Sequence, residues 1–209
     1  MAGWSWTQRS SLGQAQSSVL SRPRKFDVLF TSRLQLRRWR GSDRGPFARM
    51  NADPEVMRFF PARRTRAESD ALIDRIERGF DERGFGLWAV ERLDTGEFIG
   101  FTGLNPMPAG TPGEGDFEVG WRLSRRAWGH GFATEAARAS IQVGLAAVGL
   151  PRLWSLTAVT NLPSQSVMRR AGLREHSRYD HPGLADDDPL RRHVAYWAEG
   201  CLTPAPLWR

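Results

Sequence analysis

Two residue types that often build protein sites are almost missing from this chain of 209 residues. Cysteine occurs once, at Cys201, so no disulfide can form within the chain and no cysteine metal cluster can be built. Lysine also occurs once, at Lys25, and arginine supplies nearly all of the positive charge. No apolar run approaches the length of about 18 residues that a membrane helix needs, and the N-terminus lacks the apolar segment of a secretory signal. These absences favour a cytoplasmic protein that does not bind membranes.

The net charge of +7 is unevenly distributed. Arg9, Arg22, Arg24 and Lys25 all precede the first acidic residue, Asp27, and so supply four of these seven charges. Later arginines alternate with acids, as in RIERGFDER, which indicates a solvated surface rather than a nucleic-acid interface. We therefore expect no nucleic-acid partner, although a phosphate-bearing ligand suits the excess charge. The acid-free start of the chain also fits an organelle transit peptide.

Length and composition favour one folded domain with two short tails. Residues 1–25 are rich in Ser, Gln and Arg without periodicity, which predicts a flexible tail. We place the domain at residues 26–200 and a second tail at residues 201–209.

The first half of the domain combines a strand with helices. SRLQLRRW alternates Leu34 and Leu36 with polar residues, as a strand does. Ser42 and Asp43 are cap candidates for a following helix, and Asp53-Pro54 opens a short helical turn. A longer helix follows, with a capping box from Thr65 to Glu68 and a stop at Gly84.

The second half predicts the rest of a sheet. LWAVERLDTGEFIGFTGL indicates a hairpin, and DFEVGWRL alternates apolar residues with Glu118, Gly120 and Arg122. We expect a bulge or a close backbone approach at Gly120. A helix from Ala133 to Val148, a strand in LWSLTAVT, a helix in SQSVMRRAG and a last strand in RRHVAYWAE complete a mixed α/β fold.

The segment RRAWGHGFATEAARASI places a glycine turn directly before a helix. A helix N-terminus offers unpaired N–H groups and the positive end of the helix dipole. Gly129 and Gly131 remove the side chains that would keep a phosphate away, and Arg126 adds a charge. We interpret the turn as a phosphate cradle, with a tight turn that binds nothing as the alternative. No Gly-Lys-Ser/Thr follows, and Thr134 replaces the third glycine of a dinucleotide fingerprint.

Here the sequence resembles a family. Arg126-x-x-Gly129-x-Gly131 between a strand and a helix is similar to the acetyl-CoA pyrophosphate loop of the GNAT acyltransferases. TSRLQLRRW and ADPEVMRFFP resemble the first strand and the early helical segment of that family, and NLPSQSVMRRAGL resembles its Asn-x-x-Ser helix, with Asn161 and Ser164 in register. The resemblance runs from about residue 30 to residue 198 and is nearest to the branch that includes ribosomal-protein-alanine N-acetyltransferases.

The resemblance implies a V-splayed mixed sheet flanked by helices, with acetyl-CoA as co-substrate in the gap beside a bulged strand and with no metal. The pantetheine arm would lie along the edge of that strand, and backbone N–H groups of the turn would hold the pyrophosphate. The residues implied in cofactor binding are Trp121, Arg122, Leu123, Arg126, Gly129, His130, Gly131, Phe132, Ala133, Thr134, Asn161 and Ser164.

The resemblance also assigns the chemistry. Glu118 stands where the family often places its general base, although it could instead pair with Arg122. Met168 occupies the place of the tyrosine that protonates the thiolate in many members. Ser164 is our replacement for that acid, with a plain N-cap as its alternative. Direct transfer in a ternary complex follows, without an intermediate on Cys201.

The acceptor is an amine that the sequence does not specify further. Phe60 and Trp88 are candidates for the acceptor wall, with a place in the core as the alternative, and His181 is a candidate for its border. The acids and histidines of DHPGLADDDPLRRH match no common metal spacing. A homodimer is left open. The competing interpretation is a non-catalytic acyl-CoA-binding module or a module that docks on RNA or the ribosome.

Overall fold

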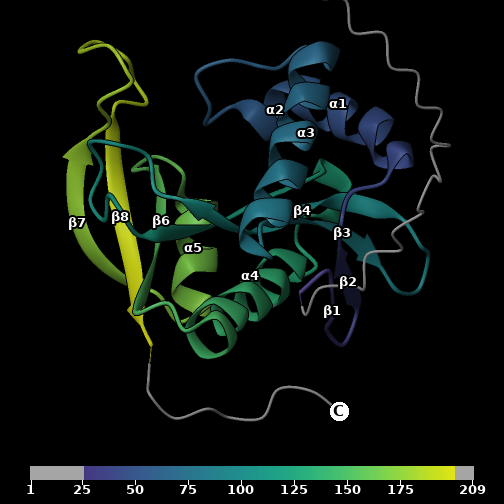
Figure 1. Cartoon of the computed structure of the whole chain (residues 1–209). Helices are drawn as coiled ribbons and strands as arrows, with labels where there is room; N and C mark the ends of the chain where they lie inside the picture. The colour runs from purple at the N-terminus through teal and green to yellow at the C-terminus, as the bar shows by residue number, and fades with distance from the viewer. Residues whose placement is uncertain (1–25, 201–209) are drawn as a thin grey trace, which may run out of the picture.

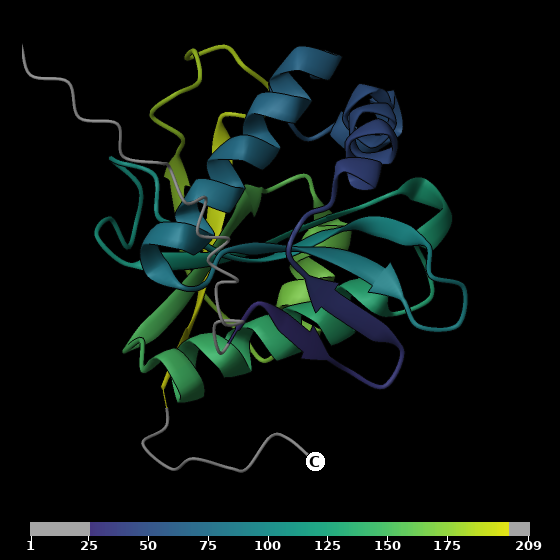
Figure 2. The same ribbon diagram turned by 45° about the vertical axis from the view of Figure 1, so that its right-hand side comes forward.

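The computed structural model describes residues 26–200, and the two predicted tails and Cys201 lie outside this range. An eight-stranded sheet forms the middle layer of the molecule. Helices α1, α2 and α3 lie over one face of the sheet, and α4 and α5 lie over the other (Figures 1 and 2). The predicted mixed α/β architecture is confirmed.

The strand order is β1-β2-β3-β4-β5-β6-β8-β7, and only the β5–β6 pair is parallel. The strands are β1 (Val28–Phe30), β2 (Leu34–Arg37), β3 (Leu87–Arg92), β4 (Phe98–Pro106), β5 (Phe117–Leu123), β6 (Arg152–Ala158), β7 (Arg174–Asp180) and β8 (Arg192–Glu199). Strand β1 was not predicted, whereas the β3–β4 hairpin was.

The sheet opens into a V between β5 and β6. These strands pair only at Phe117 with Leu153 and at Glu118 with Trp154, and beyond Glu118 they separate. Strands β4 and β5 stay paired from Gly100 to Pro106 without a register shift. The predicted V is therefore present, but the bulge predicted at Gly120 is wrong, because Gly120 lies in regular register with Gly103.

The helices between β2 and β3 form where their local sequence signals predict them. They are η1 (Gly41–Asp43), α1 (Arg44–Ala52), α2 (Pro54–Met57) and α3 (Arg66–Arg83). Asp53 caps α2, the capping box of Thr65 and Glu68 forms on α3, and Gly84 ends α3 in the left-handed conformation. Asp43 precedes α1 but makes no side-chain cap.

The later helices begin at the predicted places. They are η2 (Arg125–Ala127), α4 (Phe132–Gln142), the π-helical turn η3 (Val143–Val148) and α5 (Leu162–Arg170). Helix α4 and η3 together span the predicted helix, and Gly149 ends it with a φ of 84°. A side chain at Gly144 would collide with Leu153 and Leu104, so this glycine lets η3 lie close against the sheet.

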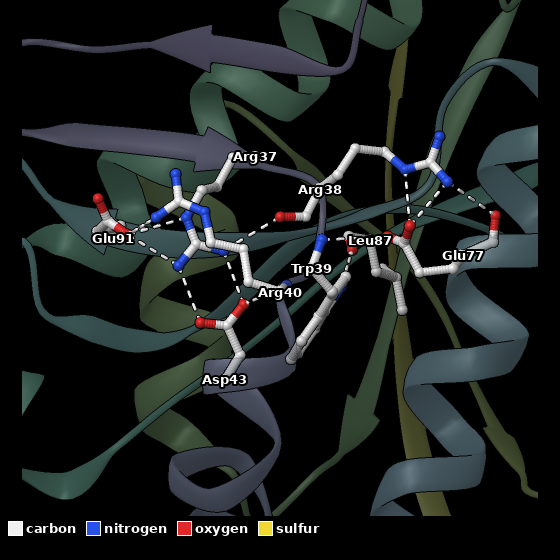
Figure 3. A network of polar contacts seen from close by, with 8 residues as sticks. All are labelled: Arg37, Arg38, Trp39, Arg40, Asp43, Glu77, Leu87 and Glu91. Carbon is white, nitrogen blue, oxygen red and sulfur yellow. Dashed lines mark hydrogen bonds and ion pairs between the residues drawn. The ribbon is translucent and has the colours of Figure 1, made fainter. Parts of the chain in front are cut away.

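Buried ion pairs fix the path from β2 into α1 (Figure 3). The Arg37 guanidinium binds both carboxylate oxygens of Asp43, at 2.7 and 2.9 Å, and donates from Nε to Glu91 at 2.9 Å. Burial alone would lower the pKa of Arg37, but the bonds to Asp43 and Glu91 raise it. Asp43 also accepts a hydrogen bond from the backbone N–H of Arg40. The Asp43 carboxylate is thus bonded within this network and does not cap α1.

The indole of Trp88 is fully buried in the core. It packs edge-on against Phe80 and donates from Nε1 to the carbonyl of Phe26 at 2.7 Å. This position corrects the prediction that Trp88 lines the acceptor wall, because its ring has no exposed surface for a ligand.

Candidate active site

The glycine turn before α4 has the backbone shape of an anion cradle. Gly129 and Gly131 have φ angles of 81° and 79°, a left-handed conformation that residues with a side chain rarely adopt. Gly131 is the N-cap of α4, and no side chain caps this helix end. The first N–H groups of α4 are therefore available for an anionic ligand.

Arg33 braces this turn from the β1–β2 connection. Its Nη1 atom donates to the carbonyl of His130 at 3.0 Å, and its guanidinium stacks on the Phe132 ring at 4.6 Å. Glu135, on the first turn of α4, accepts bonds from Thr31 at 2.6 Å and from Arg33. Burial raises the pKa of Glu135, but these bonds hold it below its usual range. Sequence reasoning missed Arg33. Its guanidinium lies at the glycine turn, where a positive charge would also favour a bound phosphate.

Other predicted residues of the turn have protein partners. Arg126 forms an ion pair with Glu97 of the β3–β4 turn, so its charge is shared. The Thr134 hydroxyl accepts a bond from Arg170 Nε at 3.4 Å, which brings a further cation of α5 beside α4. The His130 ring is exposed and lies 5.7 Å from the Phe132 ring.

The free edge of β5 faces the V. The N–H of Ser124 bonds to Ile99 and the carbonyl of Gly120 accepts from Thr102, so the even-numbered residues of β5 direct their backbone toward β4. Trp121 and Leu123 accordingly direct theirs into the gap. The Leu123 carbonyl already accepts from Trp128 Nε1 at 2.9 Å, which leaves Trp121 as the open position of the two.

Asn161 and Ser164 lie where β6 leads into α5, and Asn161, not Ser164, caps this helix. Asn161 is the N-cap of α5 and accepts from Ser164 N at 3.3 Å, while its amide nitrogen donates to Thr157 at 2.9 Å. Both ends of the Asn161 side chain thus have one partner within the protein, and its contact with pantetheine stays a prediction. Ser164 is not the cap, and its hydroxyl remains on the first turn of the helix. Met168 is buried in the core.

Glu118 lies on β5 at the last residue that pairs with β6. Burial raises the pKa of its carboxyl to about 7, and a hydrogen bond of 3.3 Å from Asn105 Nδ2 lowers it only in part. The alternative pairing with Arg122 is not formed. A carboxyl with a pKa near neutrality, at the point where β5 and β6 begin to separate, suits a general base.

A tyrosine that sequence reasoning missed stands beside Glu118. The hydroxyl of Tyr179, on β7, is buried without a hydrogen-bond partner among the described residues. Burial and then the charge of Glu118 raise the pKa of Tyr179 above its usual range, so the hydroxyl stays protonated. Its ring lies 6.5 Å from the His181 ring and 5.8 Å from that of His193, and a place for His181 at the border of the acceptor site stays a prediction.

Arg122 and Phe60 mark the other end of the same face of β5. The Arg122 side chain is 8% exposed, lies 4.0 Å from the centre of the Phe60 ring and donates from Nη1 to Asn51 of α1 at 2.7 Å. Its guanidinium thus points toward α1 and its backbone faces β4, so neither part of Arg122 faces the gap between β5 and β6.

Residues 26–200 contain no group of three or more His, Cys, Asp or Glu side chains that is arranged to hold a metal ion. No helix in the same range is both long and apolar enough to cross a membrane.

Comparison with known proteins places the chain in a family. Residues 33–174 match the acetyltransferase (GNAT) domain family. The uncharacterized protein YkkB of Bacillus subtilis is 30% identical over 148 residues, which cover 69% of this chain and 84% of that protein. The FsC-acetyl coenzyme A-N(2)-transacetylase of Aspergillus fumigatus is 30% identical over 167 residues, which cover 74% and 70% of the two chains.

A solved structure shows the same fold. The ribosomal-protein-S5-alanine acetyltransferase from Vibrio fischeri superposes with a TM-score of 0.66 at 16% identity, covering 83% of this chain and 96% of that one. The chain therefore belongs to the GNAT acetyltransferase family. It is an N-acetyltransferase that depends on acetyl-CoA.

Proposed function

We propose that this protein transfers the acetyl group of acetyl-CoA directly to a primary amine within a ternary complex, with Glu118 as the general base. The observation that carries the proposal is the Glu118 carboxyl, with a pKa of about 7 at the point where β5 leaves β6. Protein N-termini and small-molecule amines are both proposed acceptors, since similar proteins include a ribosomal-protein-alanine acetyltransferase and an FsC transacetylase.

Acetyl-CoA binding rests on two parts of the site. The turn from Arg126 to Thr134, with N–H groups at the start of α4, is our proposed pyrophosphate cradle. The free backbone of Trp121 would accept the pantetheine arm as an added strand in the V. The gap between β5 and β6 and the left-handed Gly129 and Gly131 support this arrangement.

The chemistry follows from three groups. Glu118 takes a proton from the acceptor ammonium or amine, and the amine nitrogen attacks the thioester carbonyl carbon. The N–H of Trp121 faces the gap and polarises the carbonyl oxygen. When the carbon–sulfur bond breaks, the Ser164 hydroxyl and the start of α5 stabilise the thiolate until it takes a proton. Binding both reactants together supplies much of the rate.

Tyr179 belongs to the acceptor side in this proposal. Its protonated hydroxyl lacks a protein partner and lies beside Glu118, so we assign it to the acceptor amine or to a water that links the amine to the base.

The test is release of CoA thiol in the presence of amines, measured for the wild type and for Glu118→Gln. We expect the variant to lose about two to four orders of magnitude in kcat, the usual contribution of a general base. Its acetyl-CoA affinity, measured by calorimetry, should equal that of the wild type. Turnover that survives the substitution contradicts the role of Glu118, and a folded wild type that binds no acetyl-CoA contradicts the proposed site.

A further inference from the structure

Arg122 is a buried cation for which the described part of the chain provides no carboxylate. It is 8% exposed, and the only hydrogen bond of its side chain within residues 26–200 joins Nη1 to the neutral Asn51 amide. Its Nε atom is buried and has no hydrogen-bond partner in the same range. Taking a charge out of water is costly unless the charge is paired, so an unpaired buried guanidinium needs a reason.

Arg37 provides an internal comparison. It is 3% exposed, and the fold surrounds it with Asp43 and Glu91, which together bind all three guanidinium nitrogens. Arg122 is buried almost as deeply and has instead the rings of Phe60, at 4.0 Å, and Phe101, at 5.5 Å. Aromatic faces offset part of a cation's lost hydration, but they bond to none of its N–H groups.

A second arginine adds to the positive charge. Arg64 lies close enough that its charge lowers the pKa of Arg122, after the larger effect of burial, to about 10. The Nε atom of Arg64 is also buried, and no described residue forms a hydrogen bond with it. Its backbone N–H bonds to the carbonyl of Asn51, so one residue of α1 holds both arginines in place. Two adjacent guanidiniums with unused donors are suited to an oxyanion.

Open space lies over Gly120, the residue of β5 midway between Glu118 and Arg122. Residues 118, 120 and 122 lie on one face of β5, and a side chain at Gly120 would meet no atom within 4 Å. Glu118 and Arg122 thus stand at the two ends of a stretch of strand about 13 Å long, with a bare glycine between them.

We propose that the acceptor carries an anionic group, a carboxylate or a phosphate, which Arg122 binds with Arg64 while the amine of the same molecule lies at Glu118. This inference rests on the proposed acetyl transfer and specifies its substrate class. The length of the strand between the two ends requires several bonds between the amine and the anion. A small amino acid with a spaced carboxylate and a peptide whose second residue is acidic both present this chemistry.

The experiment compares matched acceptors by CoA thiol release. Glycine, β-alanine, γ-aminobutyrate and ε-aminohexanoate vary the spacing, n-butylamine removes the anion, and phosphoethanolamine replaces the carboxylate. A peptide pair with Asp or Asn at the second position tests the protein source. We expect the better charged acceptors to exceed their neutral partners by about tenfold or more in kcat/KM, mostly through KM, with an optimum in chain length. Comparing kcat/KM for the peptide pair with kcat/KM for the amino acids shows whether the acceptor is a protein N-terminus or a small molecule.

Arg122→Met should reduce this ratio of charged to neutral acceptors to near one. Arg78→Met is the matched control, because Arg78 lies exposed on α3, and it should keep the ratio of the wild type. Thermal unfolding and acetyl-CoA calorimetry show whether each variant is folded. Arg122→Met that retains the wild-type ratio overturns the proposal.

A measurement on the wild type alone covers the case in which Arg122→Met does not fold. Butyrate should inhibit competitively against the amine and not against acetyl-CoA, and butyramide should inhibit at least about tenfold more weakly. Equal inhibition by the two, or a wild type that favours neutral amines, overturns the anionic acceptor. Absence of thiol release with every amine contradicts the proposed function itself, which is a distinct result.

Discussion

Asn105 and Glu118 face each other across β4 and β5, and Nδ2 of Asn105 donates a hydrogen bond of 3.3 Å to Oε1 of Glu118. This bond favours the ionised carboxylate, whereas burial favours the neutral acid. Burial is the larger effect, and the carboxyl is left with a pKa of about 7. The pair therefore sets the pH at which Glu118, the proposed base, becomes ionised.

Activity should rise with pH as Glu118 ionises. We expect kcat/KM of the wild type to show a limb centred near the Glu118 pKa of about 7. Asn105→Ala removes the bond that lowers this pKa, so the limb should move to higher pH. The acceptor amine also titrates, but its pKa is the same in both experiments, so only Glu118 can produce a shift. Superimposable pH profiles of the two enzymes would show that another group is responsible.

The same carboxyl should make folding stability depend on pH. Its pKa is about 7 in the folded protein against the usual 4.5 of a glutamate, so the folded state binds more protons between these values and loses stability as the pH rises through them. The loss for this shift is on the order of 3 kcal/mol at most. Denaturant unfolding of Glu118→Gln should therefore show a stability that exceeds that of the wild type increasingly from about pH 5 to pH 8. A constant difference would contradict the shift.

Tyr179→Phe should act on stability and activity in opposite directions. Removing a buried hydroxyl that has no partner raises the free energy of unfolding by about 1 kcal/mol. Loss of its contact to the acceptor should lower kcat/KM by about tenfold. Tyr196→Phe is the control, because the buried Tyr196 hydroxyl contacts Arg169, Gln165 and Glu175 and its removal should destabilise the protein. Unchanged activity in Tyr179→Phe would remove Tyr179 from the site.

Gly131→Glu should abolish acetyl-CoA binding, since it places a side chain and a negative charge at the N-terminus of α4. Gly149→Glu is a matched control: Gly149 has a φ of 84°, against 79° at Gly131, and follows η3 at the far end of the same helical run. Both variants strain the backbone alike, by about 1 kcal/mol. Calorimetry should show loss of affinity only for Gly131→Glu. Equal affinities would mean that the turn has an architectural role.

Asp43→Asn should destabilise the protein by about 3–5 kcal/mol, because it leaves the buried Arg37 with an incomplete partner set. Asp94→Asn removes a carboxylate from the exposed pair with Arg92 and should have little effect. Chemical denaturation of both variants measures the difference. A small effect of Asp43→Asn would mean that α1 is held mainly by its apolar contacts.

Sequence reasoning succeeded where the signal is local. The capping box of α3, the hairpin turn and the start of a helix after the glycine turn depend on residues within a few positions of one another. Arg33 was missed because its contact with His130 spans 97 positions of sequence. Alternation placed Glu118 and Arg122 on one face of a strand, but it could not show that α1 covers one end of that face. Tyr179 was missed for the same reason, since only the pairing of β7 with β8 brings it near Glu118.

The two register pairs between β5 and β6 are the only backbone ladder that joins strands β1–β5 to strands β6–β8 in the part of the chain that the structure describes. The sheet is therefore built as two plates that meet along a short seam and separate at the proposed co-substrate site. Acetyl-CoA bound between them would bridge both plates over a length that their own hydrogen bonds leave open. The molecule that supplies the acetyl group would thus also connect the two plates, and turnover from acetyl-CoA to free CoA would take place where the sheet has only two paired positions.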